Sequence, residues 1–245
     1  QLHGTKVHFL PDAEIFEETV YDYNTLKQRL RETAFLTKGL CITLKDTRED
    51  SLHNHKFHYA GGIKEFVEYL NRSNVPLYEQ VFYCEGQRDG VLVEVAMQHN
   101  DSYTENIYSF VNNINTPEGG THLSGFKAAL TDLFNKYARA NKLLKDNEDS
   151  LSGEDIREGM TAVISIKIPE PQFEGQTKQK LGNNEARGAV SAIVSEQLTY
   201  FLEQNPSVAK MICDKAILAQ RARAAARKAR DLTRRKTALD SMTLP

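Results

Sequence analysis

Period-two alternation between residues 81 and 111 is the feature that most constrains the fold of this 245-residue chain. The segments 81–84, 91–98 and 107–111 place bulky β-branched or aromatic side chains at every second position. Such alternation is typical of strands with one buried face, and these side chains favour the pleated conformation. The chain therefore contains a β-sheet, and other segments must cover it.

Helical periodicity accounts for much of the remaining chain. We expect helices over about 24–37, 63–71, 121–140, 184–201 and 207–239, and further strands at 5–10, 40–45, 57–59 and 162–168. Because strands and helices come in runs with little strict alternation, the pattern predicts an α+β fold with helices on one face of a small sheet. Residues 1–205 would form this core, and residues 206–245 a long basic C-terminal helix.

Positive charge is concentrated near the C-terminus. Nine basic residues and one acid lie between residues 215 and 236, whereas the whole chain carries a net charge of −2. Helical spacing places one basic set on a single face, opposite a small-residue stripe from Leu218 to Leu239 expected to dock on the core: Arg223, Arg227, Arg230 and Arg234. A solvated face is the plain alternative, but like charges at this spacing repel each other. We therefore expect contact with double-stranded DNA, through phosphates and not base edges.

Composition excludes several classes of protein. No apolar run approaches the roughly 18 residues of a membrane-spanning helix, and the chain opens without an apolar signal segment.

Cys41, Cys84 and Cys213 show no CxxC spacing, so we expect buried free thiols in a reducing cytoplasm. Because the chain starts at Gln1 without an initiator Met and ends abruptly, we expect a section of a longer protein.

The sequence contains no motif of a complete active site. The chain lacks GxxxxGK[ST], GxGxxG and GxSxG patterns, and no acidic pair is arranged for catalysis. His53, His55 and His58 form an HxHxxH cluster, but no Cys lies nearby, so exposed loop histidines are favoured over a zinc site. His122 follows Gly119-Gly120-Thr121, where a capped structural turn is favoured over an anion site. We therefore predict no catalytic and no metal-binding residue here.

A short loop follows the expected strand at 162–168. It reads EPQFEGQTKQKLG over residues 170–182 and offers the amide of Gln176 and the ammonium of Lys178, with a glycine on either side. A lysine presents a compact charge with three donors, which suits a terminal phosphate. Composition alone favours an ordinary solvated connection.

Three longer stretches carry a resemblance to a known family. They are REGMTAVISIK at 157–167 with the loop after it, SFVNNINTPEGGTH at 109–122 with Gly125-Phe126-Lys127, and the tail RRKTAL at 234–239. In this order they resemble the B subunits of bacterial type IIA topoisomerases. The resemblance covers essentially the whole chain, and the tail favours gyrase over topoisomerase IV.

The resemblance implies a transducer domain, which couples ATP binding and hydrolysis to DNA capture and passage during supercoiling. Gln176 and Lys178 match the family's QTK loop, which contacts the γ-phosphate of ATP held by an upstream domain. Lys127 matches a basic position facing the DNA cavity. The implied fold includes a left-handed βαβ crossover, an exception to the usual hand.

The same resemblance implies the partners of the parent protein. They are double-stranded DNA, the gyrase A subunit and a second copy of the gyrase B chain in an ATP-gated dimer, with no membrane partner. ATP and Mg²⁺ would serve the full enzyme, with Mg²⁺ held outside this section, which alone would be inactive. The alternatives are the equivalent section of topoisomerase IV and a non-enzymatic DNA-binding module.

Overall fold

The structure, a computed structural model, describes residues 3–48, 53–145 and 147–241, with side chains of the last helix described as far as Arg234. The chain divides into two compact units, residues 1–62 and residues 63–245. The boundary expected after residue 205 coincides with a junction between two helices inside the second unit. Compact units separate where few contacts cross, and the start of the last helix packs on the core instead.

The second unit is built on a five-stranded mixed sheet. Its strands are β3 (Phe82–Arg88), β4 (Val91–His99), β5 (Asn106–Val111), β6 (Ile114–Asn115) and β7 (Met160–Lys167), in the order β3-β4-β7-β5-β6. All neighbouring pairs are antiparallel except β5 and β7, which are parallel. Asp89 and Gly90 both have positive φ in the tight turn between β3 and β4, as a two-residue hairpin turn requires. The α+β prediction is confirmed.

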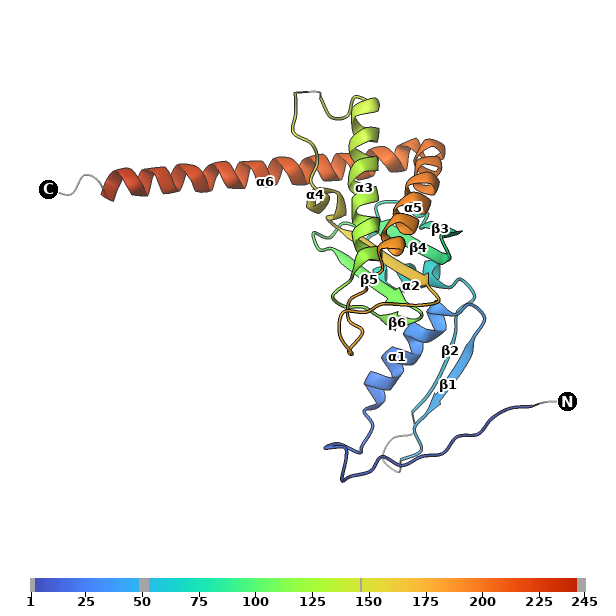
Figure 1. The fold of residues 1–245 in the computed structure, drawn as a ribbon. Helices are drawn as coiled ribbons and strands as arrows, with labels where there is room; N and C mark the ends of the chain where they lie inside the picture. The colour runs from blue at the N-terminus through green and yellow to red at the C-terminus, as the bar shows by residue number, and fades with distance from the viewer. Residues whose placement is uncertain (1–2, 49–52, 146, 242–245) are drawn as a thin grey trace. The chain divides into compact units, whose positions relative to one another are not determined.

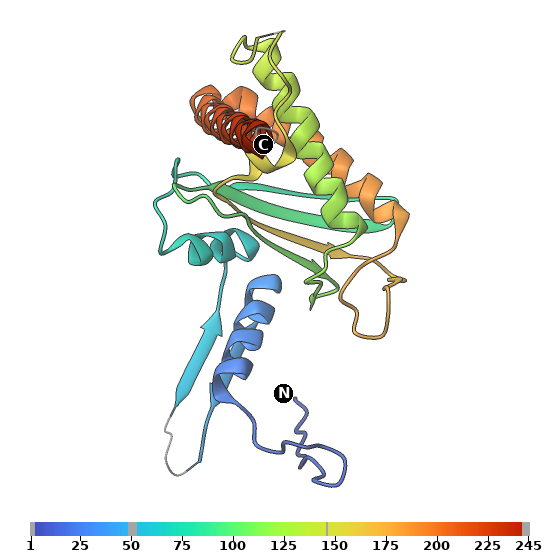
Figure 2. The ribbon, with the colours of Figure 1, turned by 90° about the vertical axis from the view of Figure 1, so that its left-hand side faces the viewer.

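Helices cover both faces of this sheet. α3 (Thr121–Ala140) and α5 (Asn184–Gln204) pack against one face and share the main hydrophobic core with it. α2 (Ile63–Asn71) lies on the other face (Figure 2), with the Phe66 ring centre 6.3 Å from that of Phe110. The expectation of helices on one face therefore holds for α3 and α5 but not for α2. The two former helices approach closely at Gly125, where an added Cβ would lie 2.4 Å from the Arg187 carbonyl oxygen.

Parallel neighbours in a sheet need a crossover connection. The chain leaves β5, forms β6, and passes through α3 and the short α4 (Gly153–Arg157) before it enters β7. α4 begins with a capping box, in which the Ser152 and Asp155 side chains and backbone N–H groups bond reciprocally. The left hand of the crossover stays a prediction.

α6 (Pro206–Ser241) is the long C-terminal helix that the sequence predicts. It begins at a proline, whose missing N–H costs nothing at a first helical position. The buried residues of its first turns are Val208, Ala209, Ile212, Cys213, Ala216, Ile217 and Ala219. From residue 221 to 234 the helix is exposed and extends away from the sheet (Figure 1).

The expected docking of the small-residue stripe on α6 is wrong for the described side chains. Leu218 is 69% exposed and Leu232 is 58% exposed. Alanines at the intervening positions offer little apolar area, so burial of this face would gain little free energy. The apolar side chains at the start of the helix make the packing contacts instead.

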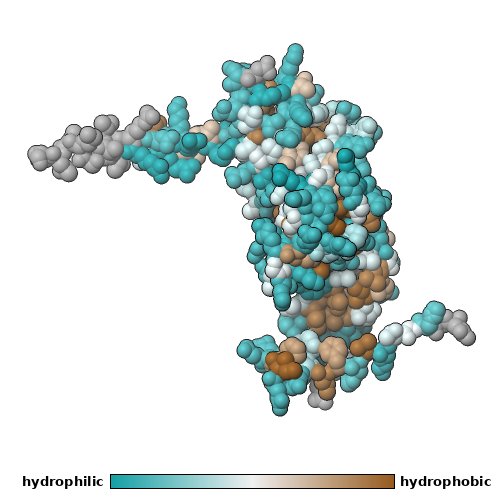
Figure 3. Space-filling model, in the orientation of Figure 1, coloured by the Kyte–Doolittle hydropathy of each residue, from teal (hydrophilic) through white to brown (hydrophobic). Residues whose placement is uncertain are grey.

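The first unit holds an extended segment, one helix and a hairpin. α1 (Tyr23–Leu36) is capped by the Asp22 side chain, and β1 (Cys41–Lys45) pairs antiparallel with β2 (Asn54–His58). Residues 5–10 form no strand, because none of the described strands pairs with them. Several hydrophobic side chains of residues 7–21 are exposed, and hydrophobic atoms gather on the surface of this unit (Figure 3).

The three cysteines are free, but they are not all buried. Cys84 and Cys213 are buried, and burial raises the pKa of each thiol to about 12. Cys41 is exposed, which corrects the sequence-based expectation. It alternates with the more buried Ile42 and Leu44 along β1, so its side chain lies on the solvent face. In the described residues, no helix is long and apolar enough to cross a membrane.

Candidate functional site

Residues 172–182, here called the 172–182 loop, form a closed loop between β7 and α5. The Gly182 N–H donates to the Gln172 carbonyl oxygen at 2.7 Å, and the Glu174 N–H donates to the Lys180 carbonyl oxygen at 2.8 Å. The Lys180 ammonium also pairs with the Glu174 carboxylate at 3.0 Å. These bonds join the two arms and leave residues 175–179 as the tip.

The tip exposes the two side chains predicted to meet a nucleotide. Gln176 and Lys178 are both exposed. Lys178 adopts φ 56°, which is uncommon for a residue with a side chain. Its Nζ lies 6.0 Å from the centre of the Phe173 ring. A charged group is therefore held at the end of a bonded loop, open to solvent.

Asn183 fastens the first arm of the loop to the start of α5. Its Oδ1 accepts the Gln172 N–H at 2.6 Å, and its Nδ2 donates to the Glu170 carbonyl oxygen at 3.1 Å. Asn183 occupies the N-cap position of α5, but its side chain makes no capping bond. At 2% exposure it instead holds the base of the loop.

Lys127, predicted to face DNA, lies in an ion-pair network. Its Nζ is 2.6 Å from Glu105 Oε1, and Arg157 Nε is 2.8 Å from Glu105 Oε2. Burial raises the pKa of Glu105, but the hydrogen bonds from the two cations outweigh it and leave the pKa below its usual value. Lys127 carries its charge beside a carboxylate, and its contact with DNA stays a prediction.

The four arginines predicted to contact DNA have different surroundings on α6. Arg223 makes a two-bond ion pair with Asp155, with Nε to Oδ1 at 3.0 Å and Nη2 to Oδ2 at 2.6 Å. Arg230 Nε donates to the backbone of its own helix at 3.4 Å. Arg227 and Arg234 are exposed and meet no ion-pair partner among the described residues. On the face that Figure 3 shows, the described part of this helix that extends from the core carries mostly hydrophilic side chains.

Asp155 is the residue of this region that sequence reasoning missed. It is 4% exposed, and its side chain takes part both in the capping box of α4 and in the ion pair with Arg223. The pattern Ser152-x-x-Asp155 is the sequence signature of a helix start, so its local role could have been found. Its pairing with a residue 68 positions later carries no local signal.

His122 is buried and neutral. It is 0% exposed, its Nε2 lies 3.3 Å from Thr116 Oγ1, and burial lowers its pKa to about 4. A neutral ring supplies no positive charge to an anion, which agrees with the structural interpretation of this motif. Thr121, expected to cap α3, instead starts it, and Gly120 takes the N-cap position without a side-chain bond.

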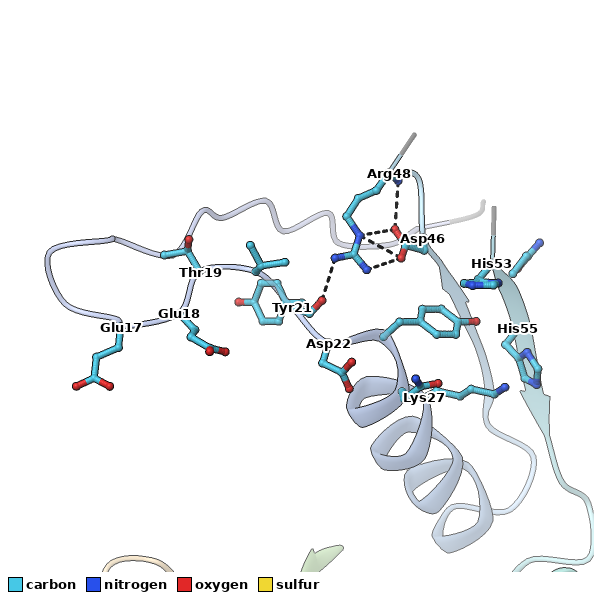
Figure 4. A pocket seen from close by; sticks show the side chains of 14 residues that line it. Glu17, Glu18, Thr19, Tyr21, Asp22, Lys27, Asp46, Arg48, His53 and His55 are labelled. Carbon is cyan, nitrogen blue, oxygen red and sulfur yellow. Dashed lines mark hydrogen bonds and ion pairs between the residues drawn. The ribbon is translucent and has the colours of Figure 1, made fainter. Parts of the chain in front are cut away.

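A cavity of about 970 Å³ lies within the first unit, beside the N-terminus of α1 (Figure 4). Arg48 pairs with Asp46 through both carboxylate oxygens and donates to the Tyr21 carbonyl oxygen at 3.1 Å. His53 and His55 line it. Among the described residues, no group of three or more His, Cys, Asp or Glu is placed to hold a metal ion.

The sequence matches the DNA gyrase B family over residues 62–232. The chain belongs to this family. The match begins one residue before the second unit and ends within α6. It therefore covers the sheet, the 172–182 loop and most of the basic face.

Individual relatives extend the similarity to the whole chain. The DNA gyrase B protein of Clostridium acetobutylicum is 58% identical over 244 residues, which are 99% of this chain. The chain spans 38% of the length of that relative. Family membership thus concerns one section of the proteins that the chain matches.

Two solved structures are similar in fold to this chain. The 43K ATPase domain of Thermus thermophilus gyrase B, in complex with an aminocoumarin, matches with a TM-score of 0.78 and 40% identity, over 91% of this chain and 59% of that one. The topoisomerase IV ATP-binding domain of Francisella tularensis matches with a TM-score of 0.72 and 27% identity, over 87% and 57%.

Proposed function

We propose that this chain is the transducer section of a gyrase B protein, which relays ATP binding and hydrolysis to the capture and passage of a DNA duplex. Support comes from family membership, from relatives named as DNA gyrase B proteins, and from similarity to an ATPase domain. The parent would be an ATP-dependent topoisomerase that supercoils DNA in the cytoplasm. This section alone would be inactive.

The observation that carries the proposal is the exposed Lys178 ammonium at the tip of a bonded loop. ATP would supply a γ-phosphate, whose negative charge a lysine from a neighbouring domain can neutralise. Gln176 would donate its amide to the same group. When the γ-phosphate leaves, both side chains lose their partner, so the loop can report the nucleotide state.

Other parts of the machinery would lie outside this chain. An upstream domain would hold ATP, and residues outside this section would hold Mg²⁺. The parent gyrase B protein would form an ATP-gated dimer and assemble with the gyrase A protein.

The test is ATP turnover by the complete gyrase B protein with Lys178→Ala. A charge-assisted hydrogen bond contributes about 1.5–3 kcal/mol, so we expect at least about a tenfold loss of kcat. Lys180→Ala is the matched control, because Lys180 lies in the same loop and pairs with Glu174. The proposal would be contradicted if both variants lost kcat equally, or if neither variant lost kcat.

The basic face of α6 is proposed to contact DNA phosphates. Arg227 and Arg234 are the best placed, because they are exposed and meet no ion-pair partner among the described residues. The same DNA contact would include three side chains whose charges already lie beside acceptors of this chain: Arg230, Arg223 and Lys127. Contacts of this kind position a duplex without reading its sequence.

DNA titrations at several salt concentrations test this contact. The slope of log affinity against log salt is about 0.9 per phosphate engaged. Changing Arg227 and Arg234 to Ala should reduce the slope by about 2 units. Exposed Lys210, paired with Asp214 in the first turns of α6, supplies the control Lys210→Ala. An unchanged slope would remove the basic face from the proposal.

The topoisomerase IV alternative is favoured by one observation, the similarity to the Francisella tularensis domain. The higher identity to gyrase B relatives favours gyrase. Supercoiling of relaxed circles by the complete complex would indicate gyrase, and decatenation without supercoiling would indicate topoisomerase IV. A non-enzymatic module would instead bind duplex DNA tightly with no linked ATP turnover.

A further inference from the structure

The second arm of the 172–182 loop pairs with a segment distant in sequence. The Glu118 N–H donates to the Gln179 carbonyl oxygen at 3.1 Å, and the Leu181 N–H donates to the Gly119 carbonyl oxygen at 3.1 Å. The Thr121 N–H donates to the Leu181 carbonyl oxygen at 3.0 Å. We call these three bonds the 118–121 ladder. They are backbone bonds, so they fix the path of the loop and not a single side chain.

The ladder requires glycine at residue 120. A Cβ there would lie 2.4 Å from the Leu181 carbonyl oxygen and 2.5 Å from its backbone nitrogen. Gly120 also has φ 136°, a conformation that other residues rarely adopt. The close approach of the two backbones therefore depends on the missing side chain.

The last bond of the ladder involves the N-terminus of α3. α3 starts at Thr121, and its N-cap residue makes no side-chain bond to the first turn. The first N–H groups of a helix need partners from outside the helix. The Leu181 carbonyl oxygen supplies one of them, so the loop acts as part of the cap of α3.

The segment before the ladder is fixed to the sheet. The Thr116 N–H donates to the Ser109 carbonyl oxygen at 2.9 Å, and the Gly119 N–H donates to the Thr116 carbonyl oxygen at 2.8 Å. Ser109 and Thr116 are both buried and bond through their hydroxyls at 2.8 Å. The ladder thus joins the loop to β5 on one side and to α3 on the other.

We infer that Gly120 is a positioning residue. It allows the 172–182 loop to be held against β5 and the start of α3, so that Lys178 keeps a fixed position relative to the sheet. In this inference, the role of Lys178 rests on the proposed function. The position of the loop rests on the hydrogen bonds alone. A displacement of Lys178 would pass along the ladder to the N-terminus of α3.

Two variants break the ladder in different ways. Gly120→Ala inserts a methyl group where the two backbones meet. Thr121→Pro removes the N–H that bonds to Leu181, and its ring displaces that carbonyl. Proline suits the first position of a helix, and the extended ψ of −162° at Gly120 suits a residue before proline. The second variant therefore keeps the test decisive if the first fails to fold.

Gly188→Ala is the matched control. Gly188 is an exposed glycine within α5, and an added Cβ there would meet nothing within 4 Å. We expect this change to leave the loop and the ATP turnover as they are.

The first readout is hydrogen exchange of the complete gyrase B protein. We expect the Leu181 and Glu118 amides to exchange about tenfold faster in both ladder variants, which corresponds to about 1.4 kcal/mol. The control should exchange as the unchanged protein does. Exchange rates that stay within twofold in both ladder variants would overturn the inference.

The second readout is ATP turnover. Each ladder variant should lower kcat in the same direction as Lys178→Ala, and combining either with the pair Gln176→Ala and Lys178→Ala should add no further loss, because the loop acts through these two side chains. Independent, multiplying losses would overturn the positioning role. If Lys178→Ala alone leaves kcat unchanged, the proposed function fails, and the exchange rates still decide whether the ladder holds the loop.

Discussion

At the residue scale, two buried histidines show how local contacts set a protonation state. His99 Nε2 lies 3.0 Å from the Ile156 carbonyl oxygen, which can only accept, so Nε2 carries the proton. Nδ1 then accepts the Tyr78 hydroxyl at 3.0 Å. Burial lowers the pKa of His99 to about 4, and the pKa of His122 falls to about 4 for the same reason. Both rings are neutral in the folded protein.

These two residues predict how stability depends on pH. An unfolded histidine has a pKa near 6.5, so between pH 6.5 and 4 the unfolded chain binds more protons. The free energy of unfolding should therefore fall as the pH drops through this window, by about 2 kcal/mol per histidine between pH 7 and 5. Urea unfolding at pH 7 and pH 5 measures it.

Single substitutions assign that effect to its source. His122→Gln should reduce the loss of stability between pH 7 and pH 5, whereas His8→Gln, at an exposed position, should not. Equal pH dependence in the unchanged protein and in His122→Gln would contradict the assignment.

At the element scale, the Asp155–Arg223 pair ties α4 to α6. Asp155 is 4% exposed, so removing its cationic partner leaves a buried carboxylate with fewer bonds. We expect Arg223→Ala to lower the free energy of unfolding by about 1–3 kcal/mol. Arg227→Ala, on the same helix but without an ion-pair partner among the described residues, should change it by less than about 0.5 kcal/mol. Denaturant unfolding of both variants makes the comparison.

A double-mutant cycle isolates the pair from its surroundings. Asp155→Asn and Arg223→Ala should each destabilise the protein, and the double variant should lose less than the sum of the two. Strict additivity would show that the two side chains do not interact, despite the 2.6 Å contact.

The same elements show how far sequence reasoning reaches. Alternation of the side chains predicted β4, and burial alternates over residues 91–94, whereas residues 95–99 are all buried because helices cover both faces of the sheet. It could not reveal that α6 leaves the core after residue 220, since the alanine stripe has the right spacing but too little apolar area. Nor could it pair Arg223 with Asp155, because this contact depends on how α4 and α6 approach each other.

The candidate loop was predictable in part. Its exposure follows from polar residues and glycines between a strand and a helix. Its attachment to residues 118–121 was not, because backbone bonds between distant segments leave no side-chain pattern. The glycine at 120 was visible only as a turn, while the structure gives it a close contact with Leu181.

At the scale of the whole molecule, the proposed function depends on one relay. A nucleotide held by an upstream domain would contact Lys178. The resulting displacement of the hydrogen-bonded loop would be transmitted to the sheet and α3. The relay requires that the orientation of this section relative to the upstream domain follows the nucleotide state. It also requires that Lys178 carries this dependence.

The most direct measurement is the distance between two spin labels in the complete gyrase B protein, one on the upstream domain and one at Tyr200→Cys on α5. Tyr200 is 58% exposed, so a label there would disturb little, and exposed Cys41 would be replaced by Ser. We predict that a non-hydrolysable ATP analogue shifts this distance in the labelled protein and leaves it unshifted when Lys178→Ala is added. The same shift with and without the lysine would contradict the relay.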